Sequence, residues 1–149
     1  MKQIVLTLLF VPLLISCQSE QKTLIHEDSE LLDYEDFMDI KLEWKNLFSP
    51  AKSQYFVYIY SVSCGHCERI KEEVLNYIYD DRESYYLMEC CDEIPLSVTT
   101  DETFGKTTID EVSILGTPTL LQITEGYLSL NIAGEKMILD FLARLPHNN

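Results

Sequence analysis

The sequence predicts a single α/β domain in which a central mixed β-sheet is flanked by helices on both faces. One observation is the order of the elements, which reads helix, strand, helix, strand, short helix, strand, strand, helix. Another is size, because 149 residues with 46% hydrophobic composition suffice for one ordinary core and are too few for two comfortable domains. We therefore expect residues 33–149 to fold as one unit.

Residues 1–16 are predicted to be an export signal that precedes this domain. They carry one cation, Lys2, and then an uncharged apolar run from Ile4 to Ile15. The run is about twelve residues long, whereas a helix needs about twenty to cross a bilayer. An uncleaved membrane helix is therefore the weaker alternative, and an ordinary secretory signal is a second one.

The end of this segment, LISC, resembles the bacterial lipobox, in which the cysteine is lipidated and becomes the first residue of the mature chain. The match places lipidation at Cys17. Residues 17–32 are polar and charged without a core pattern, so we expect them to form a tether. The resemblance implies a protein held by its lipid at the extracytoplasmic face of a bacterial membrane.

The charge balance is strongly acidic, with 25 acidic against 11 basic residues and a formal net charge of −14. Such a surface repels nucleic acid and anionic lipid headgroups. We therefore expect no nucleic-acid partner, and membrane contact through the lipid alone. Export would also place the cysteines after Cys17 in a compartment where disulfides persist.

The first element of the domain is predicted to be a helix over residues 33–48. Asp33 is its expected N-cap, and Ser49 and Pro50 would end it. The apolar side chains of this segment share one helical stripe: Phe37, Ile40, Trp44, Leu47 and Phe48.

A buried strand is predicted over residues 55–61, because YFVYIYS is apolar at consecutive positions and rich in β-branched and aromatic types. Its aromatic side chains are interpreted as sheet core rather than as a binding platform. The tetrapeptide CGHC follows directly and opens a helix. The buried side of that helix is expected to be Ile70, Val74, Tyr77 and Ile78.

The second half of the domain is predicted to complete the sheet. Residues 84–91 form the next strand, parallel to the first, and the irregular segment 92–116 contains a short helical candidate at 108–115. Residues 124–126 indicate a hairpin between TLLQI and YLSLNI. A final helix over 135–145 places four apolar residues on one face: Ile138, Phe141, Leu142 and Leu145.

The two cysteines of CGHC, Cys64 and Cys67, are predicted to form a redox centre. Because the tetrapeptide stands where a strand ends and a helix begins, Cys64 occupies the helix N-terminus, where free backbone N–H groups and the helix dipole stabilise a thiolate. Cys67 lies one turn further in and is placed to resolve a mixed disulfide. A protonated His66 would favour the reduced form, with nearby acids partly offsetting its field.

From about Gln54 to Leu145 the chain resembles the thioredoxin superfamily, and CGHC is the tetrapeptide typical of protein disulfide isomerase. A second family motif, GTPT at residues 116–119, stands just before a strand. The resemblance implies a thioredoxin-like fold, with a cis-proline opposite the cysteine pair. It implies catalytic roles for Cys64, Cys67 and His66, and substrate contacts from Gly65, Thr117 and Pro118.

Two positions depart from the family pattern. The buried acid six residues before the first cysteine, which relays protons for the second, is replaced by Tyr58, and the tryptophan that often precedes the first cysteine is replaced by Ser63. Proton transfer at Cys67 would then use water, His66 or another group. The rate or the favoured direction is expected to change, whereas the fold is not.

Cys90 and Cys91 stand at the end of the second predicted strand, with side chains expected on opposite faces. At least one should be a buried apolar residue, and a strained bond between the two or an auxiliary redox role are alternatives. Together with CxxC they could supply four sulfurs to zinc, but adjacent cysteines on a strand lack the knuckle of a structural site. We expect no metal and no cofactor.

These observations predict a monomeric, membrane-anchored thiol–disulfide oxidoreductase that exchanges disulfides with cysteines of exported proteins. A membrane redox partner could reset its cysteine pair. His66 favours disulfide donation or isomerisation. Two alternatives remain open: a reductase of the same chemistry that feeds electrons to an envelope pathway, and a non-catalytic binding module whose cysteines form a permanent staple.

Overall fold

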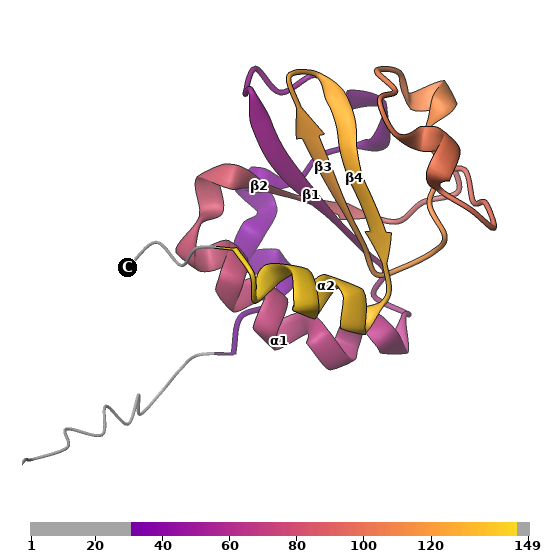
Figure 1. Cartoon of the computed structure of the whole chain (residues 1–149). Helices are drawn as coiled ribbons and strands as arrows, with labels where there is room; N and C mark the ends of the chain where they lie inside the picture. The colour runs from indigo at the N-terminus through magenta and orange to yellow at the C-terminus, as the bar shows by residue number, and fades with distance from the viewer. Residues whose placement is uncertain (1–30, 146–149) are drawn as a thin grey trace, which may run out of the picture.

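The computed structural model describes residues 31–145 (Figure 1). The expected export signal, most of the expected tether and the predicted lipidation residue Cys17 lie outside this range. Within the range, no helix is both long enough and apolar enough to cross a membrane.

Four strands form one mixed sheet: β1 (Gln54–Tyr60), β2 (Tyr85–Glu89), β3 (Thr119–Thr124) and β4 (Tyr127–Ala133). Their order across the sheet is β2-β1-β3-β4. β1 runs parallel to β2, whereas β3 is antiparallel to both of its neighbours. The predicted α/β class and the parallel pairing of the first two strands are confirmed.

β1 is an inner strand of the sheet, and every residue after Gln54 is buried. Its side chains alternate between the two faces, as those of any strand do. Three of them face one apolar cluster and three face another: Phe56, Tyr58 and Tyr60 on one side, Tyr55, Val57 and Ile59 on the other. The continuous apolar run therefore marks a strand covered twice, as predicted.

Both α-helices, α1 (Gly65–Asp80) and α2 (Glu135–Leu142), cover the same face of the sheet and pack side by side (Figure 1). A short 3-10 helix, η3 (Arg82–Ser84), leads from α1 into β2. We call the core between these two α-helices and the sheet the α-face cluster, which includes Phe37, Tyr58, Tyr60, Cys67, Ile70, Val74, Leu75, Ile78, Leu120, Ile138 and Leu142. Burial of each large aliphatic side chain in this cluster contributes about 1.5–3 kcal/mol to stability.

The opposite face is also covered by helical turns, but these are 3-10 helices embedded in loops. They include η2 (Trp44–Asn46) and η5 (Ile109–Glu111), so the helix expected over 108–115 is reduced to a single turn. We call this second core the loop-face cluster, which includes Trp44, Leu47, Tyr55, Val57, Ile59, Met88, Ile94, Val112, Ile114, Leu121, Ile123 and Leu128.

The prediction of one continuous helix over residues 33–48 is wrong. The segment forms two 3-10 helices, η1 (Tyr34–Ile40) and η2, separated by extended backbone at Lys41 and Glu43. Asp33 does cap η1, since its side chain accepts a hydrogen bond from the N–H of Tyr34 and forms a capping box with Asp36.

The break has a tertiary cause at the outer edge of β2. Lys41 forms a parallel bridge to Leu87, and the N–H of Leu42 donates to the carbonyl of Leu87 at 2.8 Å. The chain crosses the sheet edge there, so Phe37 packs in the α-face cluster and Trp44 in the loop-face cluster. The apolar stripe of this segment therefore serves two faces of the sheet.

The irregular segment 92–116 contains only two 3-10 turns, η4 (Asp101–Thr103) and η5. A buried amide on β4 holds it against the sheet. The side chain of Asn131 donates to Thr103 Oγ1 at 3.1 Å and to the carbonyl of Ser113 at 2.9 Å. These bonds fix a loop that has little regular structure of its own.

β3 and β4 form the predicted hairpin. Its two turn residues, Glu125 and Gly126, have φ angles of 51° and 78°, the left-handed conformation that a two-residue hairpin turn requires. On its other side β4 pairs with the preceding loop, because the N–H of Gly105 donates to the carbonyl of Leu128 and the N–H of Leu128 donates to the carbonyl of Lys106.

Candidate active site

Cys64 lies at the N-terminus of α1, as predicted from the strand-to-helix transition. It is the N-cap residue, with extended backbone, and its carbonyl accepts the first helical bond from the N–H of Glu68 at 3.1 Å. Its sulfur accepts a hydrogen bond from the N–H of Cys67 at 3.3 Å. A negative charge on Sγ would therefore be stabilised by a helix N–H group and by the positive end of the helix dipole.

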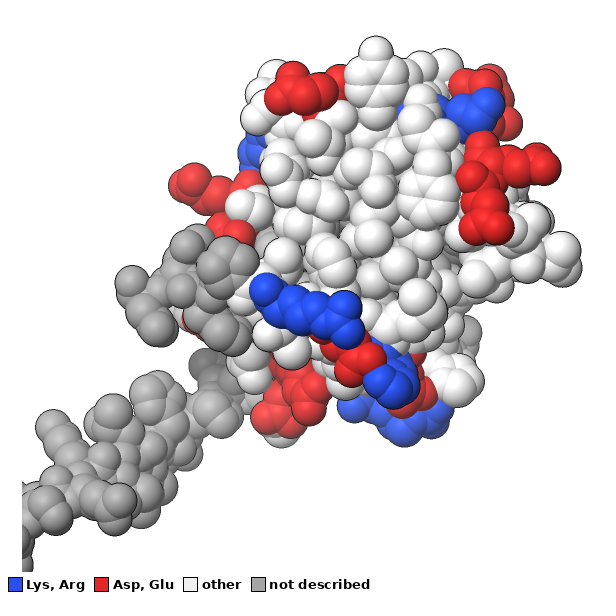
Figure 2. Space-filling model, in the orientation of Figure 1, with Lys and Arg blue, Asp and Glu red and all other residues white. Residues whose placement is uncertain are grey.

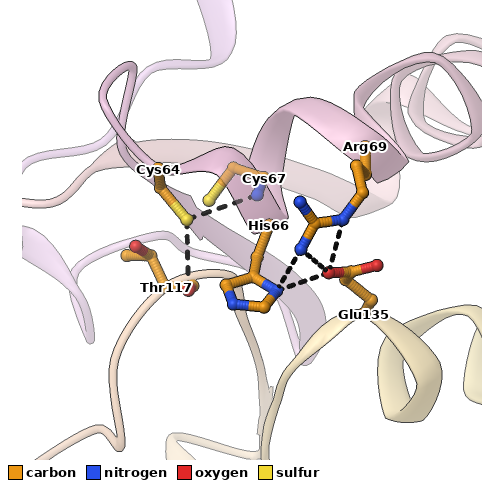
Figure 3. Close-up of polar contacts among 6 residues, drawn as sticks. All are labelled: Cys64, His66, Cys67, Arg69, Thr117 and Glu135. Carbon is orange, nitrogen blue, oxygen red and sulfur yellow. Dashed lines mark hydrogen bonds and ion pairs between the residues drawn. The ribbon is translucent and has the colours of Figure 1, made fainter.

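The GTPT segment faces this sulfur from the other side of the site (Figure 3). β3 is antiparallel to β1, so the residues just before β3 lie beside the end of β1 from which Cys64 follows. The Thr117–Pro118 peptide bond is cis, and the Cys64 thiol donates to the carbonyl of Thr117 with an Sγ to O distance of 3.3 Å. The turn is held by Thr119, whose hydroxyl donates to the carbonyl of Gly116 at 2.6 Å.

The two thiols of the pair are chemically distinct. Burial opposes ionisation of Cys64, but hydrogen bonds from the side chains of Cys67 and Thr117 and from backbone N–H groups outweigh it and lower the pKa of its thiol. Cys67 is buried, and burial reinforced by Cys64 raises the pKa of its thiol to about 11. Both are free thiols in this structure. A half-buried, more acidic thiol beside a buried, less acidic one suits stepwise disulfide exchange.

His66 does not point at either sulfur but joins a charged cluster between the two α-helices (Figure 3). Its Nδ1 contacts Glu135 Oε1 and lies 2.6 Å from Nη2 of Arg69. Arg69 in turn donates to the same Glu135 oxygen, through Nε at 3.0 Å and Nη2 at 2.5 Å. Figure 2 shows basic and acidic side chains interleaved along α2 in this region.

Sequence reasoning missed Arg69 and Glu135. It assigned no role to Arg69, and it sought the acids that offset His66 among the nearest residues of the chain. Glu135 lies 69 residues from His66. The available signal was the position of Glu135 at the start of the last helix, which gains meaning only when α2 is known to pack against α1.

Gly65 is the first residue of α1 and is exposed. A Cβ atom there would lie 3.7 Å from a guanidinium nitrogen of Arg69, an ordinary contact. The backbone at this position therefore does not require glycine. Pro118 is buried beneath the site, and Thr117 is half-buried.

Tyr58, at the position of the family's acid, is fully buried in the α-face cluster. Burial raises its pKa, and the charge of a Cys67 or Cys64 thiolate would raise it further. The hydroxyls of Tyr58 and Tyr34 interact closely enough to affect each other's pKa, but neither makes a hydrogen bond of normal geometry within residues 31–145. A phenol with a raised pKa remains protonated, so it is a poor base for Cys67.

Cys90 and Cys91 follow β2, which ends at Glu89. Cys90 is half-buried against the loop-face cluster, and Cys91 is exposed. Both are free thiols, so the strained bond between them is not present. Burial raises the pKa of Cys90, as would charge on Cys91. Among the described residues no group of three or more His, Cys, Asp or Glu side chains could hold a metal ion.

No protein-family model matches the chain, and no curated protein sequence matches it. Thioredoxins are similar among solved structures. Thioredoxin f2 of Chlamydomonas reinhardtii aligns at 13% identity over 70% of this chain and 91% of its own, with a TM-score of 0.45. Mitochondrial thioredoxin 3 of Saccharomyces cerevisiae, in its oxidised form, aligns at 14% identity over 73% and 98%, with a TM-score of 0.44.

Thioredoxin f from spinach chloroplast aligns at 14% identity over 66% of this chain and 86% of its own, with a TM-score of 0.44. The fold of the chain is α/β, a mixed four-stranded sheet with helices, as its sequence predicts. Likeness at these identities does not bear on activity or substrate, which have to be argued from the site itself.

Proposed function

We propose that this chain is an exported, lipid-anchored thiol–disulfide oxidoreductase that acts on cysteines of other exported proteins. The observation that carries the chemistry is the asymmetry of one cysteine pair. Cys64 caps α1 with a lowered pKa, and Cys67 lies buried one turn later with a raised pKa. Export and anchoring at Cys17 rest on the first seventeen residues of the sequence alone.

The reaction can be written with balanced bonds and electrons. In the reducing direction the Cys64 thiolate attacks one sulfur of a substrate disulfide, a mixed disulfide forms, and the other substrate sulfur leaves as a thiolate. Cys67 then loses its proton and attacks Cys64 Sγ, which releases the second substrate thiol and leaves a Cys64–Cys67 disulfide. The substrate has gained two electrons, and disulfide donation is the exact reverse.

The GTPT turn supports substrate binding next to the reacting sulfur. The carbonyl of Thr117 accepts a hydrogen bond from the Cys64 thiol. Once Cys64 is ionised or disulfide-bonded it can no longer donate, so this carbonyl becomes available to an N–H of the substrate chain. Apolar side chains flank the site in sequence, since Val62 is 73% exposed and Leu115 is 48% exposed. An extended, partly apolar segment around the substrate cysteine would fit this surface.

The favoured direction within the proposal is disulfide donation or isomerisation, because CGHC carries a histidine that can stabilise the reduced pair. A reductase of the same chemistry is the main competing direction. The reduction potential separates them. A reduction potential of about −180 mV, the range of protein disulfide isomerase, supports disulfide donation or isomerisation. A potential of about −270 mV, the range of thioredoxin, supports a reductase.

The proposed activity is tested by trapping substrates with the full chain in its own envelope. Cys67→Ala leaves Cys64 able to form mixed disulfides but unable to release them, so it should accumulate disulfide-linked exported proteins. Cys64→Ala/Cys67→Ala is the matched control and should trap none. If Cys67→Ala traps no more than this control, and the purified wild-type pair cannot be reduced and reoxidised, the cysteines form a permanent staple and the proposal fails.

A further inference from the structure

We propose that Glu135 is a positioning residue of the redox site, which holds His66 and Arg69 in a charged cluster and thereby makes the Cys64–Cys67 pair less oxidising than its tetrapeptide alone would be. The inference rests on the proposed function, and it assigns to the first residue of α2 a role in tuning chemistry that takes place at the first turn of α1.

The geometry brings two side chains of α1 to one carboxylate oxygen at the start of α2. Glu135 Oε1 accepts from Nε and Nη2 of Arg69 and contacts His66 Nδ1. Figure 3 shows this cluster on the α2 side of the cysteine pair, with the imidazole turned toward Glu135 and Arg69. All three side chains are partly exposed, at 29% for Glu135, 57% for Arg69 and 66% for His66. The cluster is therefore a surface feature and not part of the core.

The position of Glu135 is tied to the same turn that faces Cys64. Gly134 precedes it with a φ of 92°, and the N–H of Gly134 donates to the carbonyl of Pro118 at 2.9 Å. α2 therefore starts directly beside the GTPT segment. Glu135 reaches the first turn of α1 from there, so a substitution at this residue acts on the site without passing through the core.

Nδ1 of His66 is occupied in either protonation state. A neutral ring can accept an N–H from Arg69 at Nδ1, whereas a protonated ring donates Nδ1–H to Glu135. The cluster thus holds the imidazole between the helices. Glu135 also contributes a negative charge that partly cancels those of Arg69 and protonated His66, the two cations nearest Cys64 on α1.

The consequence for redox balance follows from the charge of the reduced state. A positive field favours the Cys64 thiolate and hence the reduced pair, which makes the disulfide a stronger oxidant. Glu135 weakens that field. Glu68, on the same turn of α1, also weakens the field. Among the described residues, however, its side chain forms no hydrogen bond with His66 or Arg69.

An ordinary surface ion pair explains the same contacts without any role in redox balance. Such pairs contribute about 0–1 kcal/mol to stability and would leave the potential unchanged. An acidic residue at the start of a helix is also favourable in its own right. The test therefore has to read a property of the cysteine pair rather than stability alone.

The experiment measures the thiol–disulfide equilibrium of Glu135→Gln against glutathione redox buffers, together with the pH dependence of Cys64 alkylation. The equilibrium constant should shift about threefold to tenfold toward the reduced protein, which corresponds to a potential about 15 to 30 mV higher. Cys64 should also react with iodoacetamide at lower pH than in the wild type.

Three variants complete the test. Asp140→Asn is the matched control, because it removes one carboxylate from α2 whose partner is Lys136 and not α1. Arg69→Gln should shift the equilibrium in the opposite direction, since it leaves the charge of Glu135 in place and removes a cation. The double variant Arg69→Gln/Glu135→Gln should return close to wild type. Circular dichroism checks that each variant is folded.

The possible outcomes separate the inference from the function it rests on. Two results would overturn the role of Glu135: equal reduction potentials for Glu135→Gln and Asp140→Asn, or shifts in the same direction for Arg69→Gln and Glu135→Gln. In either case a wild-type pair that is reduced and reoxidised reversibly would keep the proposed function intact. A wild-type pair that does not equilibrate with glutathione would overturn the proposed function itself.

Discussion

The two cysteine pairs of the domain occupy corresponding places at the end of neighbouring parallel strands, yet only one has the features of a redox centre. Cys64 and Cys67 follow β1, and Cys90 and Cys91 follow β2, where the N–H of Cys90 donates to the carbonyl of Tyr60. The pKa of Cys64 is lowered, whereas burial raises the pKa of Cys90.

The difference lies in what surrounds each sulfur. A helix begins beneath Cys64 and the GTPT turn faces it, while Cys90 packs against the loop-face cluster with no helix starting at its sulfur. Location at the carboxyl edge of a parallel strand pair is thus not sufficient to lower the pKa of a thiol. Backbone N–H groups directed at the sulfur are needed as well.

The largest expected effect is on activity. Cys64→Ser should lose all disulfide exchange above the level of buffer, because serine cannot form the mixed disulfide. Cys91→Ser should retain nearly wild-type activity, and Cys90→Ser should too, apart from some loss of stability from its half-buried position. Reduction of insulin disulfides and oxidative refolding of reduced ribonuclease measure both directions. Equal losses in Cys64→Ser and Cys90→Ser would remove the distinction between the pairs.

The next effect is a pH-dependent stability of the reduced protein. The folded pKa of Cys67, about 11, lies above its ordinary value of 9.0, so Cys67 favours the folded state below pH 9 and this advantage is lost as pH rises toward 11. Over that window the wild type should lose about 2 to 3 kcal/mol of unfolding free energy relative to Cys67→Ala.

Urea unfolding of both proteins under reducing conditions, at pH 8 and at pH 11, gives this difference directly. Buried tyrosines titrate in both proteins, so their contribution cancels in the comparison. Parallel pH profiles for wild type and Cys67→Ala would mean that Cys67 ionises as easily as a solvent-exposed thiol.

The order of alkylation gives a third comparison of the pairs. Near neutral pH the reaction rate follows the fraction of thiolate, so Cys64 should be modified before Cys90 and well before Cys67. Limited iodoacetamide treatment followed by peptide mass analysis measures this order. Modification of Cys90 ahead of Cys64 would contradict the assigned pKa directions.

The smallest expected effect concerns the turn that faces Cys64 and has no counterpart at Cys90. Thr119 is fully buried, and Thr119→Val would leave the carbonyl of Gly116 without its 2.6 Å hydrogen bond, at a cost of about 1 kcal/mol. Thr124→Val is the control on the same strand, since its hydroxyl bonds Ser129 at the surface. Thermal unfolding should separate the two, and equal melting temperatures would show that the Thr119 bond contributes nothing.

Elements with a strong local pattern could be predicted from the sequence. β1 was recognisable because it is buried on both faces and therefore apolar throughout. The hairpin was recognisable because residues 124–126, which include a glycine, separate two strand-like runs. The location of Cys64 at a helix start followed from the same strand-to-helix order.

Features decided by distant contacts could not be predicted in this way. The bridge from Lys41 to Leu87 splits what looked like one helix, because pairing with a strand edge overrides local periodicity. The contact of Glu135 with His66 depends on how α2 packs against α1, which no local pattern encodes.

Each outer strand of the sheet is also shielded at one residue from pairing with other chains. At β2 the backbone of Lys41 and Leu42 occupies the free side at Leu87, and at β4 the loop at Gly105 and Lys106 occupies both hydrogen-bonding groups of Leu128. Exposed strand edges template aggregation with unfolded polypeptide. Under the proposed function, substrates that are not yet fully folded would meet these edges, and the backbone contacts at Leu87 and Leu128 reduce the free edge with which they could pair.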